Sequence, residues 1–304
     1  MYTVTDQRGR RFIITGSNSG TGREAARRLA AAGADVVLAV RTPAKGEETR
    51  AAILRESPDA QLEVRRLDLA DLASVRDFAA GILEDSRPVH VLVNNAGVMA
   101  PRTRFETVDG FELQFGSNFL GPFALTNLLL PTLLAADAPR VTTMSSGAAN
   151  IGRIRFDDLQ SSHRYGPFRS YAQSKLADML MGRQLAKVSS ERRWGLLSTV
   201  AHPGYTRTNL QTAGANLGRA RQRTPIESTL FLSQEVEQGA EPLLFAASDP
   251  TAAQGAYYGP NGLLGMVGPT KRADYPRRAR SAQVAERLWA VAEELTGTSL
   301  PAEA

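Results

Sequence analysis

Short apolar runs alternate with amphipathic stretches along most of the chain. Each apolar run has the length of a buried strand, and the stretches between the runs carry helix-forming residues at helical spacing. Strands are therefore expected at 11–15, 35–40, 62–67, 89–94, 140–145 and 196–201. Helices are expected at 21–32, 43–56, 74–83, 112–134 and 170–188. The alternation predicts parallel strands in one sheet, with crossover helices on both faces.

The pattern becomes less regular in the last third of the chain. Residues 204–224 are rich in Gly, Asn, Thr and Arg and predict a loop, whereas 225–247 return to helical spacing. Two tyrosines between glycines at 255–260 predict a last short strand, and 281–295 predict a closing helix. No linker divides the first 200 residues. We therefore expect one α/β domain over 1–304, doubly wound around a mostly parallel seven-stranded sheet.

Composition removes several classes of function. The chain has 304 residues, 42% hydrophobic and 22% charged, which is ordinary for a globular protein in water. It has no cysteine, so disulfides, thiolate catalysis and cysteine-based metal sites are excluded. Its three histidines, His90, His163 and His202, lack metal-binding spacing, and no metal is expected. With no apolar run of about 20 residues and no signal-like N-terminus, we expect no membrane span and a cytoplasmic location.

The net charge of +5 comes mostly from scattered residues. Only Lys271–Arg280 forms a dense basic cluster. Apart from Tyr275, this cluster has no interleaved aromatic residues on which bases would stack. A solvated loop or a lid is the better interpretation, and no nucleic-acid partner is expected.

A glycine-rich turn joins the first expected strand to the first expected helix. Three glycines allow a tight turn and a close approach to a ligand, and the helix N-terminus that follows favours a pyrophosphate. This context predicts a dinucleotide site made of Gly16, Ser17, Asn18, Ser19, Gly20, Thr21 and Gly22.

The end of the second expected strand indicates which dinucleotide binds. An NAD site usually has an acidic residue about 20 residues after the turn, to bind the ribose hydroxyls. Here that acid is missing, and Arg41 stands beside the vacant place. An arginine offers a fork of donors for a 2′-phosphate, and Lys45 adds a second charge nearby. We therefore expect NADP(H) as the cofactor, although an exposed Lys45 without contact is an equal alternative.

Tyr171 and Lys175 are four residues apart in an expected helix, so they share one face. An ammonium beside a phenol favours the phenolate, and a tyrosine tuned in this way can exchange a proton near neutral pH. Taken alone, the pair also fits a packed tyrosine and a solvated lysine.

These motifs occur in an order typical of short-chain dehydrogenases/reductases, and the chain resembles that family from at least Arg11 to Tyr258. It is most similar to the single-domain branch and its retinol-dehydrogenase-like, carbonyl-reductase-like bacterial members. The residues that carry the family resemblance are 15–22, Asp68, Leu69, 94–97, Asn118, Ser146, Tyr171, Lys175, Pro203 and Gly204. The residues that carry the resemblance to the retinol-dehydrogenase-like group are 39–41, Lys45, Gly46, 152–159 and 202–208.

The resemblance implies a Rossmann-type fold, with a cofactor half at about 11–150 and a catalytic and substrate-loop half at about 151–300. It implies that Tyr171 is the general acid or base, that Ser146 rather than Ser145 binds the substrate oxygen, and that Lys175 binds the nicotinamide ribose and lowers the pKa of Tyr171. Asn118 is expected to hold a water of the proton relay. The remaining implied cofactor contacts are Asp68, Leu69, Asn94, Asn95, Ala96, Gly97, Pro203, Gly204, Thr206 and Thr208.

The expected reaction interconverts a ketone or aldehyde with an alcohol, on an apolar or aromatic substrate. The substrate would lie between residues 153–169 and 205–224, against an apolar wall of Tyr165, Phe168, Tyr205, Leu210 and Leu217. Reduction of an activated C=C bond or of a quinone is one alternative, and a non-catalytic NADP(H)-sensing protein is another. Because residues 153–169 precede a helix that often pairs with its twin in this family, both a monomer and a homo-oligomer stay open.

Overall fold

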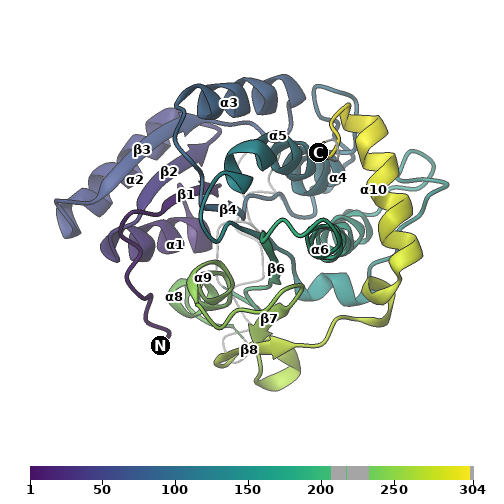
Figure 1. The fold of residues 1–304 in the computed structure, drawn as a ribbon. Helices are drawn as coiled ribbons and strands as arrows, with labels where there is room; N and C mark the ends of the chain where they lie inside the picture. The colour runs from purple at the N-terminus through teal and green to yellow at the C-terminus, as the bar shows by residue number, and fades with distance from the viewer. Residues whose placement is uncertain (207–216, 218–232, 302–304) are drawn as a thin grey trace.

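The computed structural model describes residues 1–206, 217 and 233–301. Its sheet has eight strands in the order β3-β2-β1-β4-β5-β6-β7-β8. Neighbouring strands are parallel except β7 and β8. The strands are β1 (Arg11–Thr15), β2 (Asp35–Val40), β3 (Gln61–Arg66), β4 (Val91–Asn94), β5 (Arg140–Met144), β6 (Leu197–Ala201), β7 (Tyr257–Pro260) and β8 (Thr270–Ala273). The expected doubly wound α/β fold is confirmed (Figure 1).

The sheet has one strand more than the seven expected. β8 runs antiparallel to β7, with Tyr258 opposite Arg272 and Gly259 opposite Lys271. Its residues belong to the basic cluster that the sequence had suggested as a loop. Lysines and arginines on an edge strand discourage pairing with another chain, and the same charges hide such a strand from a hydrophobicity pattern.

Helices cover both faces of the sheet because successive strand residues point to opposite sides. Ile13 of β1 belongs to a buried core shared with α3 (Leu72–Glu84), α5 (Gly121–Leu134), α6 (Pro167–Glu191) and α10 (Ala282–Thr296). Its neighbours Phe12 and Ile14 belong to a second core, shared with α1 (Gly20–Ala31), α2 (Pro43–Glu56) and α9 (Glu241–Ser248). The short α8 (Val236–Gly239) precedes α9.

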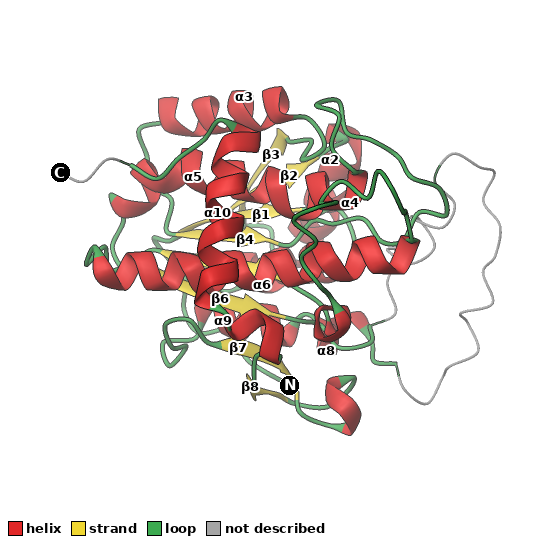
Figure 2. Cartoon of the chain, turned by 90° about the vertical axis from the view of Figure 1, so that its right-hand side faces the viewer, coloured by secondary structure: helices red, strands yellow, loops and turns green. Residues whose placement is uncertain are grey.

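The helix expected at 112–134 is three segments in continuous succession: α4 (Leu113–Phe115), a π-helical turn η1 (Gly116–Leu120) and α5. Behind them, α10 packs on α5 and lies across α6 (Figure 2). The rings of Phe123 and Trp289 meet with centroids 4.7 Å apart. No helix in the described ranges is long and apolar enough to span a membrane.

The strand order reverses between β1 and β4, since β1 continues to β2 on one side and β4 continues to β5 on the other. In open α/β sheets, ligands bind in the crevice beyond the carboxyl ends of the strands at such a reversal. The glycine turn follows β1 at this edge, residues 95–97 follow β4, and Ser145 and Ser146 follow β5. The topology therefore collects the predicted site residues at one edge of the sheet.

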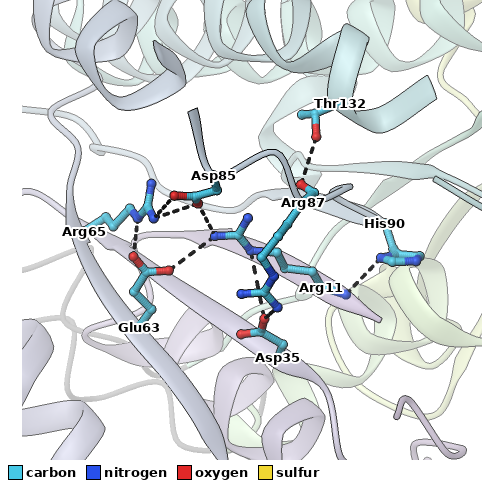
Figure 3. A network of polar contacts seen from close by, with 8 residues as sticks. All are labelled: Arg11, Asp35, Glu63, Arg65, Asp85, Arg87, His90 and Thr132. Atoms are coloured by element: carbon cyan, nitrogen blue, oxygen red, sulfur yellow. Dashed lines mark hydrogen bonds and ion pairs between the residues drawn. The ribbon is translucent and has the colours of Figure 1, made fainter. Parts of the chain in front are cut away.

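Charged side chains gather near the opposite ends of β1 and β2 (Figure 3). Arg11, whose side chain is 3% exposed, contacts Asp85 at 2.6 Å and Glu63 at 3.3 Å. Arg65 also binds both of these carboxylates. Arg87 pairs with Asp35, the first residue of β2. This network links β1, β2 and β3 to the end of α3.

Candidate active site

The glycine turn is held by side chains from β1 and from the segment after β4. The Thr15 hydroxyl accepts hydrogen bonds from the amides of Asn95 and Ala96, each at 2.9 Å. The Asn95 amide group donates to the Thr15 carbonyl, and its oxygen accepts from Thr21. Asn95, expected to contact the cofactor, therefore uses its side chain to fix the turn. The Thr21 hydroxyl thereby ties the first turn of α1 to the segment after β4.

At two positions of this turn, only a glycine fits, because a side chain would collide with neighbouring atoms. At Gly16, with φ of +67°, a Cβ would lie 2.9 Å from Ala96. At Gly22 it would lie 2.4 Å from the Asn95 amide nitrogen and 2.6 Å from the Gly16 carbonyl oxygen. Any side chain at either position would push the turn apart.

The N-terminus of α1 is suited to an anion. Ser19 stands at its N-cap without a side-chain capping bond, and the first turn has no acidic residue. The hydroxyl of Ser17 is buried and has no partner in the described part of the chain. These donors and the helix dipole fit the pyrophosphate of a dinucleotide. Asn18, expected to join them, is partly buried in the same turn.

Arg41 and Lys45 lie at the end of β2 and the start of α2, and both are exposed. Neither forms an ion pair within the ranges 1–206 and 233–301. Their charges are thus available to a ligand at this edge of the sheet.

Residues expected around the adenosine divide into two groups. Asp68 is partly buried and accepts a hydrogen bond from the Ala70 amide, while Leu69 is 8% exposed. Asn94, by contrast, turns its amide into the core, where it donates to Thr126 of α5. Its side chain is 3% exposed and holds α5 against β4, so the expectation that it lines the adenosine does not fit this geometry.

Asn118 lies in the π-helical turn and is 2% exposed. Its oxygen accepts from the Val98 amide at 2.7 Å, and its nitrogen donates to the Val98 carbonyl and to Ser174 of α6. A Cβ at Gly97 would be 3.1 Å from the Asn118 oxygen and 3.6 Å from Lys175 Nζ. Single π-helical turns often occur at functional sites. Through Asn118 and Ser174, this turn is bound to α6, the helix of Tyr171.

The two serines after β5 have different environments. Ser145 is buried and its hydroxyl donates to the Lys175 carbonyl at 2.7 Å. Ser146 is partly exposed at the start of the 3₁₀ helix η2 (Gly147–Ile151), where its hydroxyl accepts from the Ala148 amide. The Ser146 proton therefore stays available to a substrate oxygen, whereas that of Ser145 is already donated.

Tyr171 lies in the first turns of α6, where Pro167 begins the helix. Its side chain is 4% exposed, and its hydroxyl has no hydrogen-bond partner among the described residues. The ring of Phe168 is 6.3 Å from that of Tyr171. A phenol held this firmly, with its proton uncommitted, is well placed for proton transfer.

Lys175 shares the helix face of Tyr171 and is 3% exposed. Its ammonium donates to the Met144 carbonyl at 3.0 Å and to Asp178 at 2.9 Å. Burial works to lower the pKa of Lys175, but the charges of Asp178 and then Tyr171 outweigh it and raise that pKa. The sequence analysis missed Asp178. An acid three residues after a lysine is usually a surface pair, and only the fold shows that this one is buried.

The loop after β6 holds its residues through the backbone. Thr206 is 4% exposed and donates to the Pro203 carbonyl, so its hydroxyl is already used. At Gly204, φ is +63° and a Cβ would meet the Met266 carbonyl at 2.3 Å. His202 packs against Tyr257, and burial lowers its pKa to about 4. Thr208 lies outside the described residues.

The residues expected to form an apolar wall differ in their surroundings, and the wall itself stays a prediction. Phe168 is 47% exposed, and Tyr205 is partly buried. Tyr165 instead serves the scaffold, because its hydroxyl donates to the Pro101 carbonyl at 2.7 Å. Leu217 is 37% exposed, and Leu210 lies outside the described residues. No cluster of metal-binding side chains occurs in the described ranges.

Comparison with known proteins agrees with this geometry. The model of the short chain dehydrogenase family matches residues 10–216. Human retinol dehydrogenase 12 is 39% identical over 297 residues, covering 95% of this chain and 87% of that protein.

Two solved structures extend the comparison. The crystal structure of an uncharacterized protein from Mycobacterium paratuberculosis superposes with a TM-score of 0.81 at 39% identity, covering 98% of this chain and 97% of the other. A short chain dehydrogenase from Shigella flexneri, complexed with NADP, has a TM-score of 0.63 at 25% identity and covers 83% and 96%. The chain belongs to the short-chain dehydrogenase family and is similar to its retinol dehydrogenases.

Proposed function

We propose that this protein is an NADP(H)-dependent oxidoreductase that interconverts a ketone or aldehyde with an alcohol. The observation that carries the proposal is the pairing of two uncommitted hydroxyl protons, those of Tyr171 and Ser146, on elements that meet at one edge of the sheet. Carbonyl reduction needs a proton donor and a hydrogen bond to the oxygen on which negative charge develops. These two side chains supply both.

The roles that we propose for Ser146 and Tyr171 follow from the surroundings of each side chain. NADPH, when bound, supplies the hydride. Ser146 donates to the substrate oxygen, and Tyr171 gives that oxygen its proton; in the oxidation direction Tyr171 takes the proton back. Lys175 places a positive charge one helical turn from the phenol and favours its ionised form. Asn118 holds η1 beside α6 through Ser174, and we propose that it borders the path by which the proton returns to solvent.

The cofactor preference rests on Arg41, which is exposed and unpaired within the described ranges. We expect Arg41→Ala to raise the KM for NADPH by about tenfold, the size of one charge-assisted contact, and to leave that for NADH nearly unchanged. The ratio of kcat/KM with the two cofactors measures this. A wild-type preference for NADH would refute the assignment of NADP(H).

We propose an apolar or aromatic substrate, since Phe168 exposes its ring beside Tyr171. The similar human protein is named for retinol, an apolar alcohol. NADPH consumption across ketones, aldehydes and quinones tests the reaction, and product analysis separates carbonyl reduction from reduction of a C=C bond. Turnover of highly charged substrates alone would contradict the substrate class. A cytoplasmic location stays a prediction of the sequence.

We further propose that the chain acts as a monomer. The helix α6, which the sequence suggested as a pairing surface, is covered by α10 of the same chain. Light scattering is expected to give a mass near 32.8 kDa. A mass of twice that value would place the pairing surface elsewhere.

A further inference from the structure

A buried ion pair, whose carboxylate the proposed chemistry does not yet use, lies on the same helix as Tyr171. Asp178 follows Lys175 by three residues on α6, and its side chain is 1% exposed. One carboxylate oxygen is 2.9 Å from Lys175 Nζ, and the other is buried without a partner among the described residues. Isolated carboxylates are rarely buried to this degree, because burial without compensation is costly. This carboxylate must therefore be considered together with the ammonium beside it.

The carboxylate affects both the charge and the position of the ammonium. A buried lysine tends to lose its proton, and a carboxylate at hydrogen-bond distance opposes that loss. An ammonium has three N–H donors. Asp178 and the Met144 carbonyl accept two of them, and the third has no acceptor in the described part of the chain.

Gly97, in the segment after β4, lies next to both Lys175 and Asn118. A Cβ at Gly97 would be 3.6 Å from Lys175 Nζ, which is ordinary van der Waals contact, and 3.1 Å from the Asn118 oxygen, which is tight. The glycine therefore lets the backbone approach the ammonium without a side chain of its own between them.

We infer that Asp178 is a positioning residue, which keeps Lys175 charged in its buried place and fixes the ammonium with one donor left for the cofactor ribose and for Tyr171. The inference rests on the proposed function of Lys175. It adds a residue that touches neither substrate nor cofactor and acts through the lysine.

Few other charges face this pair. Tyr171 is the titratable group on α6 that raises the pKa of Lys175 together with Asp178. The other charged groups of this helix are Arg169, Arg183, Lys187 and Glu191. Of these, Arg183 donates to the Ala279 carbonyl, and Lys187 pairs with Glu191 and Glu286. From the neighbouring elements, β5 presents the Met144 carbonyl to Lys175, and η1 presents the Asn118 amide to Ser174.

The charges of Asp178 and Tyr171 both raise the pKa of Lys175 against the effect of burial. Burial raises the pKa of Asp178 to about 6, and the charge of Lys175 opposes that rise. A change at Asp178 should therefore reach Tyr171 through Lys175.

The test is the pH dependence of alcohol oxidation in Asp178→Asn, which keeps the shape of the side chain and removes its charge. Burial then lowers the pKa of Lys175, and Tyr171 loses the cation beside its phenol. We expect the acid-side midpoint of kcat/KM to move up by about one unit, with an activity loss of about tenfold at pH 7 that is largely recovered near pH 10.

Two variants serve as controls. Glu191→Gln makes the same chemical change at the far end of α6, where the carboxylate is exposed and pairs with Lys187 at 3.7 Å, and it should leave the profile unchanged. Asp178→Glu keeps the charge and should keep the midpoint of the wild-type protein. An unchanged midpoint in Asp178→Asn, or an equal shift in Asp178→Glu, would overturn the inference.

Cofactor binding gives a second readout that does not require turnover. NADPH fluorescence should show weaker binding in Asp178→Asn by about fivefold or more, and no further weakening when that change is added to Lys175→Met. Equal weakening in both backgrounds would show that Asp178 acts independently of Lys175. If the wild-type protein binds NADPH but reduces no carbonyl, the proposed reaction fails while this cycle still decides the role of Asp178. If it does not bind NADPH, both proposals fail.

Discussion

The two ends of the parallel sheet use polar side chains in opposite ways. Near the amino ends of β1 and β2, Arg11 and Arg65 both bind Asp85 and so join neighbouring elements. At the carboxyl ends, Tyr171, Ser17 and the third donor of Lys175 have no partner within the described ranges. At the amino ends, ion pairs hold neighbouring elements together. At the carboxyl ends, hydrogen-bond donors stay free for a ligand, as a site that binds and converts one requires.

The largest effect should come from Tyr171→Phe, at the carboxyl end. The variant keeps the ring and its packing and removes the only proposed proton donor. We expect turnover to fall by about 10²- to 10⁴-fold, the range for a positioned general acid, with little change in melting temperature. Steady-state kinetics and thermal unfolding measure the two quantities. Undiminished turnover would remove Tyr171 from the mechanism.

Ser145 and Ser146, which follow β5 directly, allow a structural and a catalytic role to be compared at the end of one strand. Ser146→Ala should reduce kcat by about 10²-fold, since a donor to the developing oxyanion is lost. Ser145→Ala loses a buried hydrogen bond to α6 and should mainly lower the free energy of unfolding, by about 1 kcal/mol. Kinetics and urea unfolding of both variants separate the two roles. The reverse pattern would assign substrate binding to Ser145.

At the opposite end, Arg11→Met should reduce stability and leave kcat intact. The variant keeps the buried stem and removes charged hydrogen bonds to Asp85 and Glu63, which predicts a loss of about 2 kcal/mol in the free energy of unfolding. Arg8→Met, which breaks an exposed pair with Asp6, should have no measurable effect. A loss of activity in folded Arg11→Met would contradict the separation of the two ends.

The smallest expected effect is on the pH dependence of stability in acid. Burial works to raise the pKa of Asp85, but hydrogen bonds from Arg65 and Arg11 outweigh it and lower that pKa. Because the folded-state pKa lies below the unfolded value of about 3.9, the contribution of Asp85 to stability is present above that pH. It is lost as the pH falls through the folded-state pKa. Urea unfolding at pH 5 and pH 3 should show a weaker pH dependence in Asp85→Asn than in the wild-type protein.

The sequence could predict the features that depend on residues close together in the chain. The strand at 11–15, the glycine turn and the helix of Tyr171 follow from periodicity and from a motif within one segment, and the fold bears them out. The resemblance also separated Ser146 from Ser145, a distinction that agrees with their hydrogen bonds.

The rest depends on which segments meet in space. β8 is short and basic, and only its pairing with β7 makes it a strand. Asn94 and Asn95 are neighbours in a motif, yet one points into the core and the other fastens the glycine turn. The burial of Asp178 and Arg11 follows from packing by distant elements. Spacing alone could not reveal any of these.

The covering of α6 by α10 has a consequence for the order in which the molecule is made. Phe123 of α5 is 1% exposed, and its ring meets Trp289 from α10. A ribosome releases residue 289 long after residues 123 and 171, so the catalytic helix is completed before its outer cover exists. During that interval its apolar back faces water or a chaperone. The packing of α5 and α6 is therefore completed only when α10, one of the last helices to be synthesised, docks on them.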